Sequence, residues 1–177
     1  MNIAFIGPRG TGKSKFSRKL SKITGMPVIS TDMVAVYESG GISIPELIKK
    51  HNGDWRHFRN LETEILQKLQ GAQDIILDCG GGILFDVDEN GNEFFSENKL
   101  RLLHSIATVI SLSRPTDYLI KKIKNDPTRP PLSQIQSYEK ILKKRLPYYK
   151  KAAHQTIHLQ NITTTEVIQK ILAILAR

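Results

Sequence analysis

The stretch that most constrains this chain is residues 7–14, a glycine-rich turn between an apolar run and a helical pattern. The turn reads Gly7-Pro8-Arg9-Gly10-Thr11-Gly12-Lys13-Ser14 and fills the pattern G-x-x-x-x-G-K-[ST]. In the order strand, turn and helix, successive backbone N–H groups and the helix N-terminus point at one phosphate chain. Lys13 adds a mobile positive charge, and the Ser14 hydroxyl is placed to bind Mg²⁺. The sequence therefore predicts a loop that holds a nucleoside triphosphate; the alternative is a glycine turn that binds nothing.

Length and composition restrict the class of protein. With 177 residues, the chain suits one domain, and we expect a single domain over 1–177. One cysteine, Cys79, excludes an internal disulfide framework and fits a reducing compartment. No run is long and apolar enough to cross a bilayer, and the chain starts with a core strand rather than a signal peptide. We therefore expect a cytoplasmic monomer with no membrane partner.

The basic charge of the chain raises the question of nucleic acid. Lys and Arg number 26 against 17 Asp and Glu, a net charge of +9, which attracts polyanions. The basic residues are spread along the chain and aromatic residues make up only 7%, so the basic and aromatic surface of single-strand binders is not evident. We expect a small-molecule substrate and no nucleic acid. A non-catalytic ATP-binding or nucleic-acid-associated module remains the alternative.

Apolar runs alternate with helical patterns along the chain. After the strand at 2–6, we expect strands near 27–30, 75–78, 108–112 and 156–159, each followed by a helix. This alternation predicts the α/β class, with a five-stranded parallel sheet in a three-layer α/β/α arrangement. Ligand groups collect at the carboxyl ends of such strands, where Asp32 and Asp78 are found. Asp78 suits a Mg²⁺ site, or it only caps the turn that follows.

Two further segments carry candidate ligand groups. Arg59 and Glu62 lie three apart on a predicted helix, so Glu62 either holds Arg59 toward a ligand or pairs with it on a solvated face. The glycines Gly80, Gly81 and Gly82 follow a core strand, which calls for a tight turn or for a ligand against bare backbone.

Two other segments are predicted from their turn residues. Asn90-Gly91 predicts a hairpin within 85–95, whose acidic residues suggest a solvated excursion. The proline-rich stretch 125–133 carries Arg129 and suits a lid that brings a charge onto a closing site, unless it is a plain surface loop.

Taken in order, these motifs resemble the shikimate kinase family of the nucleoside monophosphate kinase-like phosphate-loop fold, over nearly the whole chain. The matching segments are Gly7–Ser14, Asp32, Phe58-Arg59-Asn60-Leu61-Glu62 (F-R-x-x-E), Gly80–Gly82, Thr128-Arg129-Pro130-Pro131-Leu132 (lid R-P-L-L) and Arg145-Leu146-Pro147-Tyr148-Tyr149 (R-x-P-x-Y). The resemblance implies a P-loop kinase fold with a substrate-binding region at about 32–62 and a mobile lid at about 125–136. It implies transfer of the γ-phosphoryl of ATP, with Mg²⁺, to the 3-hydroxyl of shikimate in aromatic amino acid biosynthesis.

The same resemblance implies a role for each matching residue. Arg59 and Arg145 would clamp the shikimate carboxylate, next to the backbone of Gly80–Gly82. Asp32 would orient or deprotonate the attacking hydroxyl, and Arg129 and Lys13 would meet the moving phosphoryl group. The nucleotide would be held by Gly7, Pro8, Arg9, Gly10, Thr11, Gly12, Lys13 and Ser14, and by Lys122, where the family has an arginine stacked on adenine.

One departure concerns the metal. The family usually has D-x-D after the second strand, whereas this chain has Ser30-Thr31-Asp32. We expect Asp78, on the neighbouring strand, to replace the missing acid and to bind Mg²⁺ together with Ser14. A kinase for gluconate or a nucleotide on the same scaffold stays open, although it would not need Arg59, the glycine triplet and Arg145 together.

Overall fold

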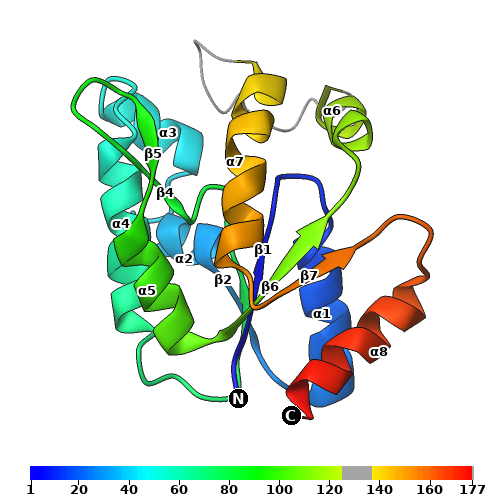
Figure 1. The fold of residues 1–177 in the computed structure, drawn as a ribbon. Coiled ribbons are helices and arrows are strands. Elements are labelled where there is room, and N and C mark those ends of the chain that lie inside the picture. Colours follow the sequence, from blue (N-terminus) through cyan, green and yellow to red (C-terminus); the bar gives the residue numbers. More distant parts are fainter. Residues whose placement is uncertain (125–136, 177) are drawn as a thin grey trace.

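A computed structural model describes residues 1–124 and 137–176. Its main sheet has five strands in the order β2-β3-β1-β6-β7, and every pairing in it is parallel. The strands are β1 (Ile3–Ile6), β2 (Val28–Ser30), β3 (Ile76–Asp78), β6 (Thr108–Ser113) and β7 (Gln155–His158). The predicted five-stranded parallel sheet is therefore confirmed, and Figure 1 shows it at the centre of the molecule.

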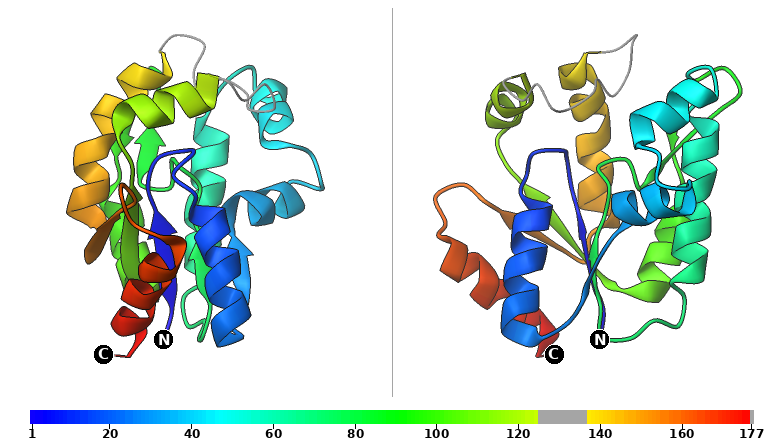
Figure 2. Two further views of the ribbon diagram at one scale, coloured as in Figure 1. Left: turned by 90° about the vertical axis from the view of Figure 1, so that its right-hand side faces the viewer. Right: turned by 180° about the vertical axis from the view of Figure 1, so that it is seen from behind.

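Helices cover both faces of this sheet. Figures 1 and 2 show α1 (Lys13–Thr24) and α8 (Thr164–Leu175) together on one side, and α4 (Arg56–Lys68) and α5 (Glu97–Ile106) on the other. Side chains of successive strand residues point to opposite faces, so β1 contributes to two cores. Ile3 and Phe5 pack with residues of α1 and α8, while Ala4 and Ile6 pack with residues of α4, α5 and α7 (Tyr138–Ala152). The three-layer arrangement is thus confirmed.

The remaining helices are α2 (Thr31–Glu38), α3 (Ile44–Lys50) and α6 (Thr116–Lys124). A small apolar cluster joins α2, α3 and α4. Ser43 and Glu46 form a capping box at the start of α3, in the S-x-x-E pattern typical of helix N-termini, and α7 continues through Pro147. Across 1–124 and 137–176, no helix is both long enough and apolar enough to cross a membrane.

The segment 85–95 forms the predicted hairpin, with β4 (Phe85–Val87) paired antiparallel to β5 (Glu93–Phe95). Its reading as a solvated excursion holds for the exposed turn at 89–92 but is wrong for the inward-facing side chains of the two strands. Phe85 is fully buried, and the ring of Phe95 stacks on Tyr148 of α7 with 4.7 Å between centroids. The side chain of Glu93 is only 19% exposed. The strands of the hairpin are therefore held against the body of the protein, and both Asp86 and Glu93 pair with buried cations.

Candidate active site

The phosphate loop lies between the end of β1 and the start of α1. Gly12 is the N-cap of α1 with φ 104°, a backbone conformation that suits glycine. Gly7 has φ 137°, and a Cβ added there would lie 2.4 Å from the carbonyl oxygen of Leu112, so the loop presses against β6. The ammonium group of Lys13 donates hydrogen bonds to the carbonyl oxygens of Gly7 and Pro8, at 2.9 and 3.1 Å. The loop thus holds its lysine over its own backbone.

A cavity of about 330 Å³ gathers most of the predicted site residues. Those lining it are Arg9, Gly10, Gly12, Lys13, Ser14, Asp32, Arg59, Asp78, Gly80, Gly81, Gly82, Lys122 and Arg145. Thr11 lies behind this surface, fully buried, with its hydroxyl donating to the carbonyl oxygen of Pro8 at 2.9 Å. Arg129 and the predicted lid lie outside the described residues. Segments far apart in the sequence therefore meet at one hollow, as the motifs predicted.

Asp32, in the first turn of α2, has its carboxylate in this cavity. It is accessible from the cavity, but the surrounding protein desolvates the carboxyl group and raises its pKa, and the charge of Glu62 raises it further. Lys13 and Arg9 act in the opposite direction. Charges from the phosphate loop and from α4 both reach Asp32, so its carboxyl group lies between the two. A raised pKa makes the ionised carboxylate a stronger base than an ordinary aspartate.

Asp78, at the end of β3, is 9% exposed and lines the cavity together with Ser14. In the pairing of β2 with β3 it lies directly opposite Ser30, the position at which the family usually has its first acid. Ser30 instead caps α2, its hydroxyl accepting a hydrogen bond from the backbone N–H of Met33 at 3.4 Å. A carboxylate is therefore present beside the expected position, on the adjacent strand.

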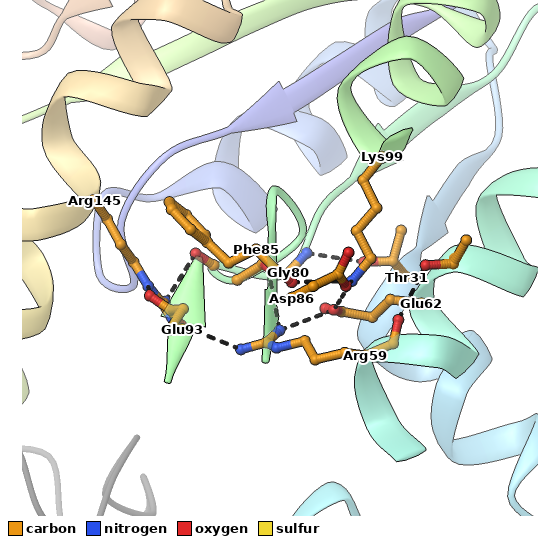
Figure 3. Close-up of polar contacts among 12 residues, drawn as sticks. Thr31, Arg59, Glu62, Gly80, Phe85, Asp86, Glu93, Lys99 and Arg145 are labelled. Carbon is orange, nitrogen blue, oxygen red and sulfur yellow. Dashed lines mark hydrogen bonds and ion pairs between the residues drawn. The ribbon is translucent and has the colours of Figure 1, made fainter. Parts of the chain in front are cut away.

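Arg59 and Glu62 are 4% and 1% exposed, so the alternative of a solvated pair is wrong. Nη1 of Arg59 lies 2.8 Å from Oε2 of Glu62, and the same oxygen accepts a hydrogen bond from Nζ of Lys99 at 3.1 Å. Lys99, fully buried on α5, also lies 2.7 Å from Asp86 of β4. Glu62 thus fixes the guanidinium of Arg59, and Lys99 fixes Glu62, which Figure 3 shows as one chain of contacts.

Arg145 reaches the same place from α7. Its Nε donates to Oε1 of Glu93 at 2.9 Å, its Nη2 donates to the other oxygen of that carboxylate, and its Nη1 donates to the carbonyl oxygen of Gly81 at 3.1 Å. Glu93 also lies 3.8 Å from Nη2 of Arg59, so it stands between the two arginines. Figure 3 shows this arrangement, with the hairpin strand that carries Glu93 between Arg145 and Arg59.

Sequence reasoning missed the roles of Lys99, Asp86 and Glu93. Lys99 left a signal, because it precedes the buried Leu103 by four positions and so lies on the apolar face of its helix. A lysine on such a face needs a buried acid as partner. Glu93 left no comparable signal, because its pairing with Arg145 joins residues 52 apart in the sequence.

The sequence suggested that the glycine triplet serves a tight turn or a ligand against bare backbone. The structure gives a different reason for two of its glycines. A Cβ on Gly80 would lie 2.3 Å from Oδ1 of Asp32, and one on Gly82 would lie 2.4 Å from Nη1 of Arg59. Two of the three glycines therefore leave room for the side chains of the site itself. Cys79 beside them is buried, and burial raises the pKa of its thiol, which agrees with a small core residue rather than a nucleophile.

Comparison with known proteins points to one family. The family model described as shikimate kinase matches residues 9–176. The chain belongs to the shikimate kinase family. A shikimate kinase of Leptospira borgpetersenii serovar Hardjo-bovis (strain JB197) is 59% identical, with 97% of this chain and 96% of that protein covered. A shikimate kinase of Dehalococcoides mccartyi (strain ATCC BAA-2100 / JCM 16839 / KCTC 5957 / BAV1) is 34% identical, over 96% of this chain and 90% of that one.

A solved structure of the family, shikimate kinase from Acinetobacter baumannii in complex with shikimate, has a TM-score of 0.79 and 27% sequence identity. It covers 99% of this chain, which covers 92% of it. Membership of the family confirms the predicted fold and the predicted class, an ATP-dependent kinase. It favours shikimate kinase over the gluconate and nucleotide kinases left open by the sequence.

Proposed function

We propose that the protein transfers the γ-phosphoryl group of ATP to the 3-hydroxyl of shikimate, giving shikimate 3-phosphate and ADP, as its family does. One observation carries the proposal: a single cavity holds the phosphate loop, the Asp32 carboxylate and the pair Arg59 and Arg145. Phosphoryl transfer depends mainly on positioning and on neutralising spread negative charge. A cavity with a phosphate-binding loop and a separate arginine pair suits a donor and an acidic acceptor bound together.

On the donor side, the loop Gly7–Ser14 would bind the phosphates through its backbone N–H groups, and Lys13 would neutralise charge on the transferred group. Lys122 donates to the carbonyl oxygen of Gly10 at 3.1 Å, which places it next to this loop, on the side proposed for the nucleotide base. Arg129 is assigned to the moving phosphoryl group by its motif alone.

On the acceptor side, Arg59 and Arg145 would bind the carboxylate of shikimate, because planar guanidinium groups match a carboxylate bidentately. This fixes the ring so that a hydroxyl faces Asp32. Asp32 would then accept the hydrogen bond of the attacking hydroxyl and take its proton as the new P–O bond forms.

The donor set also fits Mg²⁺, which prefers hard oxygen ligands and keeps several waters. The hydroxyl of Ser14 and the carboxylate of Asp78 line the same cavity beside Lys13, and these two residues would hold the ion. When bound, Mg²⁺ supplies positive charge to the β- and γ-phosphates.

Replacing Asp78 with alanine is expected to raise the Mg²⁺ concentration for half-maximal activity about tenfold, since loss of a metal-supporting group costs about 10–100-fold in metal affinity. The KM for shikimate should change little, because no hydrogen bond or ion pair within the described part of the chain joins Asp78 to Arg59 or Arg145. Activity measured against Mg²⁺ at saturating ATP and shikimate gives the first value. An unchanged Mg²⁺ titration would remove Asp78 from the metal site.

Alanine at Gly80 and at Gly82 is expected to separate two functions of the site. Overpacking costs about 1–3 kcal/mol, and 1.4 kcal/mol is tenfold in an equilibrium constant, so effects of about 5- to 150-fold are expected. Gly80→Ala crowds Asp32 and should lower kcat, whereas Gly82→Ala displaces Arg59 and should raise the KM for shikimate. Steady-state kinetics of the two variants provide each other's control; the same effect in both would contradict the separation.

The reaction itself is tested by ADP release with ATP and Mg²⁺ over shikimate, gluconate and nucleoside monophosphates. Stimulation by shikimate alone is expected, with shikimate 3-phosphate identified as the product by mass spectrometry. Stimulation by another acceptor and none by shikimate would overturn the proposal.

A further inference from the structure

The carboxylate of Glu93 is bound in the way that a substrate carboxylate would be. Arg145 grips it with two donors, Nε at 2.9 Å and Nη2, in a bidentate fork. Arg59 approaches it at 3.8 Å, which is an ion pair rather than a hydrogen bond. The two arginines assigned to the acid group of the acceptor thus converge on an acid group of the protein itself (Figure 3).

While Glu93 is in place, most guanidinium nitrogens of Arg59 and Arg145 already have a partner. Nη1 of Arg145 donates to Gly81, and Nη1 of Arg59 donates to Glu62 and to Gly82. Nε of Arg59 is buried without a hydrogen-bond partner among the described residues. A second carboxylate that binds both arginines bidentately would need the Nε and Nη2 edge of Arg145, and Glu93 occupies that edge.

The charges of the cluster lead to the same conclusion. Its cations are Arg59, Arg145 and Lys99 and its anions are Glu62, Asp86 and Glu93, so the cluster as a whole is neutral. Burial opposes ionisation of Glu93, but the hydrogen bond and charge of Arg145 and the charge of Arg59 outweigh it and lower its pKa. Glu93 is therefore a carboxylate at neutral pH. Once it moves away, the cluster has one unbalanced positive charge, which matches an acceptor with one carboxylate.

The position of Glu93 allows it to leave. Its side chain is 19% exposed, whereas that of each arginine is 5% exposed. It lies on β5 of a separate two-stranded hairpin, so its displacement breaks no pairing of the five-stranded sheet. Phe85 on β4 is fully buried and anchors the other strand of the hairpin. A rotation of the Glu93 side chain toward solvent would free the fork of Arg145.

We propose that Glu93 is a specificity-determining residue that competes with the carboxylate of the acceptor for Arg145 and Arg59. The inference rests on the proposed function, in which these arginines bind the carboxylate of shikimate. An acceptor that carries a carboxylate replaces the interactions of Glu93, whereas a neutral polyol in its place leaves the cluster with one unbalanced positive charge, because Arg59 keeps Glu62 but Arg145 loses its anion. The competition by Glu93 lowers the affinity for the acceptor. The apparent dissociation constant equals the intrinsic one divided by the fraction of molecules in which Arg145 and Arg59 are free of Glu93.

The test is direct binding of shikimate, followed by the fluorescence of Trp55, the single tryptophan of the chain, which lines the cavity with Arg59 5.2 Å from its ring. Glu93→Gln keeps the size of the side chain and removes its charge. If Glu93 holds the arginines in nine molecules of ten, this variant should lower the Kd for shikimate about tenfold. The matched control is Glu89→Gln, an exposed position of the same hairpin, which should leave Kd unchanged.

A second variant covers the case in which Glu93→Gln unfolds. Glu93→Asp keeps the charge and shortens the reach, so it should also lower Kd, by less. Circular dichroism shows whether each variant is folded. An unchanged or higher Kd for shikimate in a folded variant would overturn the proposal and would mean that Glu93 only positions Arg145. Failure of the proposed function gives a different result, because then wild-type protein and variants alike bind no shikimate while ATP still binds.

Discussion

Replacing Asp32 with asparagine is expected to lower kcat about 10²–10⁴-fold, the usual contribution of a positioned general base. Asparagine has the same shape and still hydrogen-bonds, so the cavity should keep its form and ATP should bind as before. It cannot take the proton of the attacking hydroxyl. The measurement is kcat at saturating ATP and shikimate, with Asp74→Asn as the control, because Asp74 is exposed and pairs with the N-terminus of the chain.

The pH dependence of the same pair of proteins is the sharper measurement. Desolvation and then the charge of Glu62 raise the pKa of Asp32 in the folded protein. The carboxyl group accepts a proton only when ionised, so wild-type activity is lost as the pH falls through this raised pKa, above the usual range of aspartate. Asp32→Asn should lack this acid limb. A loss of less than tenfold with the limb retained would reduce Asp32 to an orienting group.

Replacing Lys99 with methionine is expected to lower the free energy of unfolding by about 3 kcal/mol, the low end of the 3–5 kcal/mol typical of breaking a buried ion pair. Lys99 is fully buried and is paired with Glu62 and Asp86. Methionine fills similar space but leaves these carboxylates without their shared cation. The low end applies because Glu62 keeps its contact with Arg59 and Asp86 is 24% exposed.

Urea denaturation measures this difference, and Lys151→Met is its matched control. Lys151 pairs with Glu97 at 2.7 Å, but both side chains are more than half exposed, so the change should stay below about 1 kcal/mol. Equal stability of wild type and Lys99→Met would mean that desolvation of the cluster cancels its internal attraction. In that case Lys99 orders the site without stabilising the fold.

The parts of this protein that could be predicted from sequence are those governed by neighbours in the chain. The phosphate loop, the five strands and the capping boxes depend on local backbone conformation and on apolar spacing, and all are present. Asp32 and Asp78 could be placed in one site because strand ends of a parallel sheet share one edge. Arg59 and Arg145 lie on helices, and only the resemblance of their motifs to the family placed them there.

The parts that could not be predicted depend on contacts between distant segments. Whether Arg59 and Glu62 face solvent or core depends on a segment distant in the sequence. Gly82, 23 residues after Arg59, and Glu93 of the hairpin both reach its guanidinium. The acids at 85–95 suggested solvation because each alone is hydrophilic. Three cations from α4, α5 and α7 surround two of these acids, and no local pattern encodes that meeting.

The pairing of Ser30 with Asp78 has a consequence for recognising such sites. Two neighbouring parallel strands end at the same edge of the sheet. A side chain at the end of either strand can therefore reach the same point in the site. An acid that is missing at the end of one strand is compatible with an intact site when the end of the neighbouring strand carries an acid. A motif defined along the sequence counts Ser30 as the loss of an acid. A motif defined by residues that are paired across neighbouring strands counts Ser30 and Asp78 together as a match.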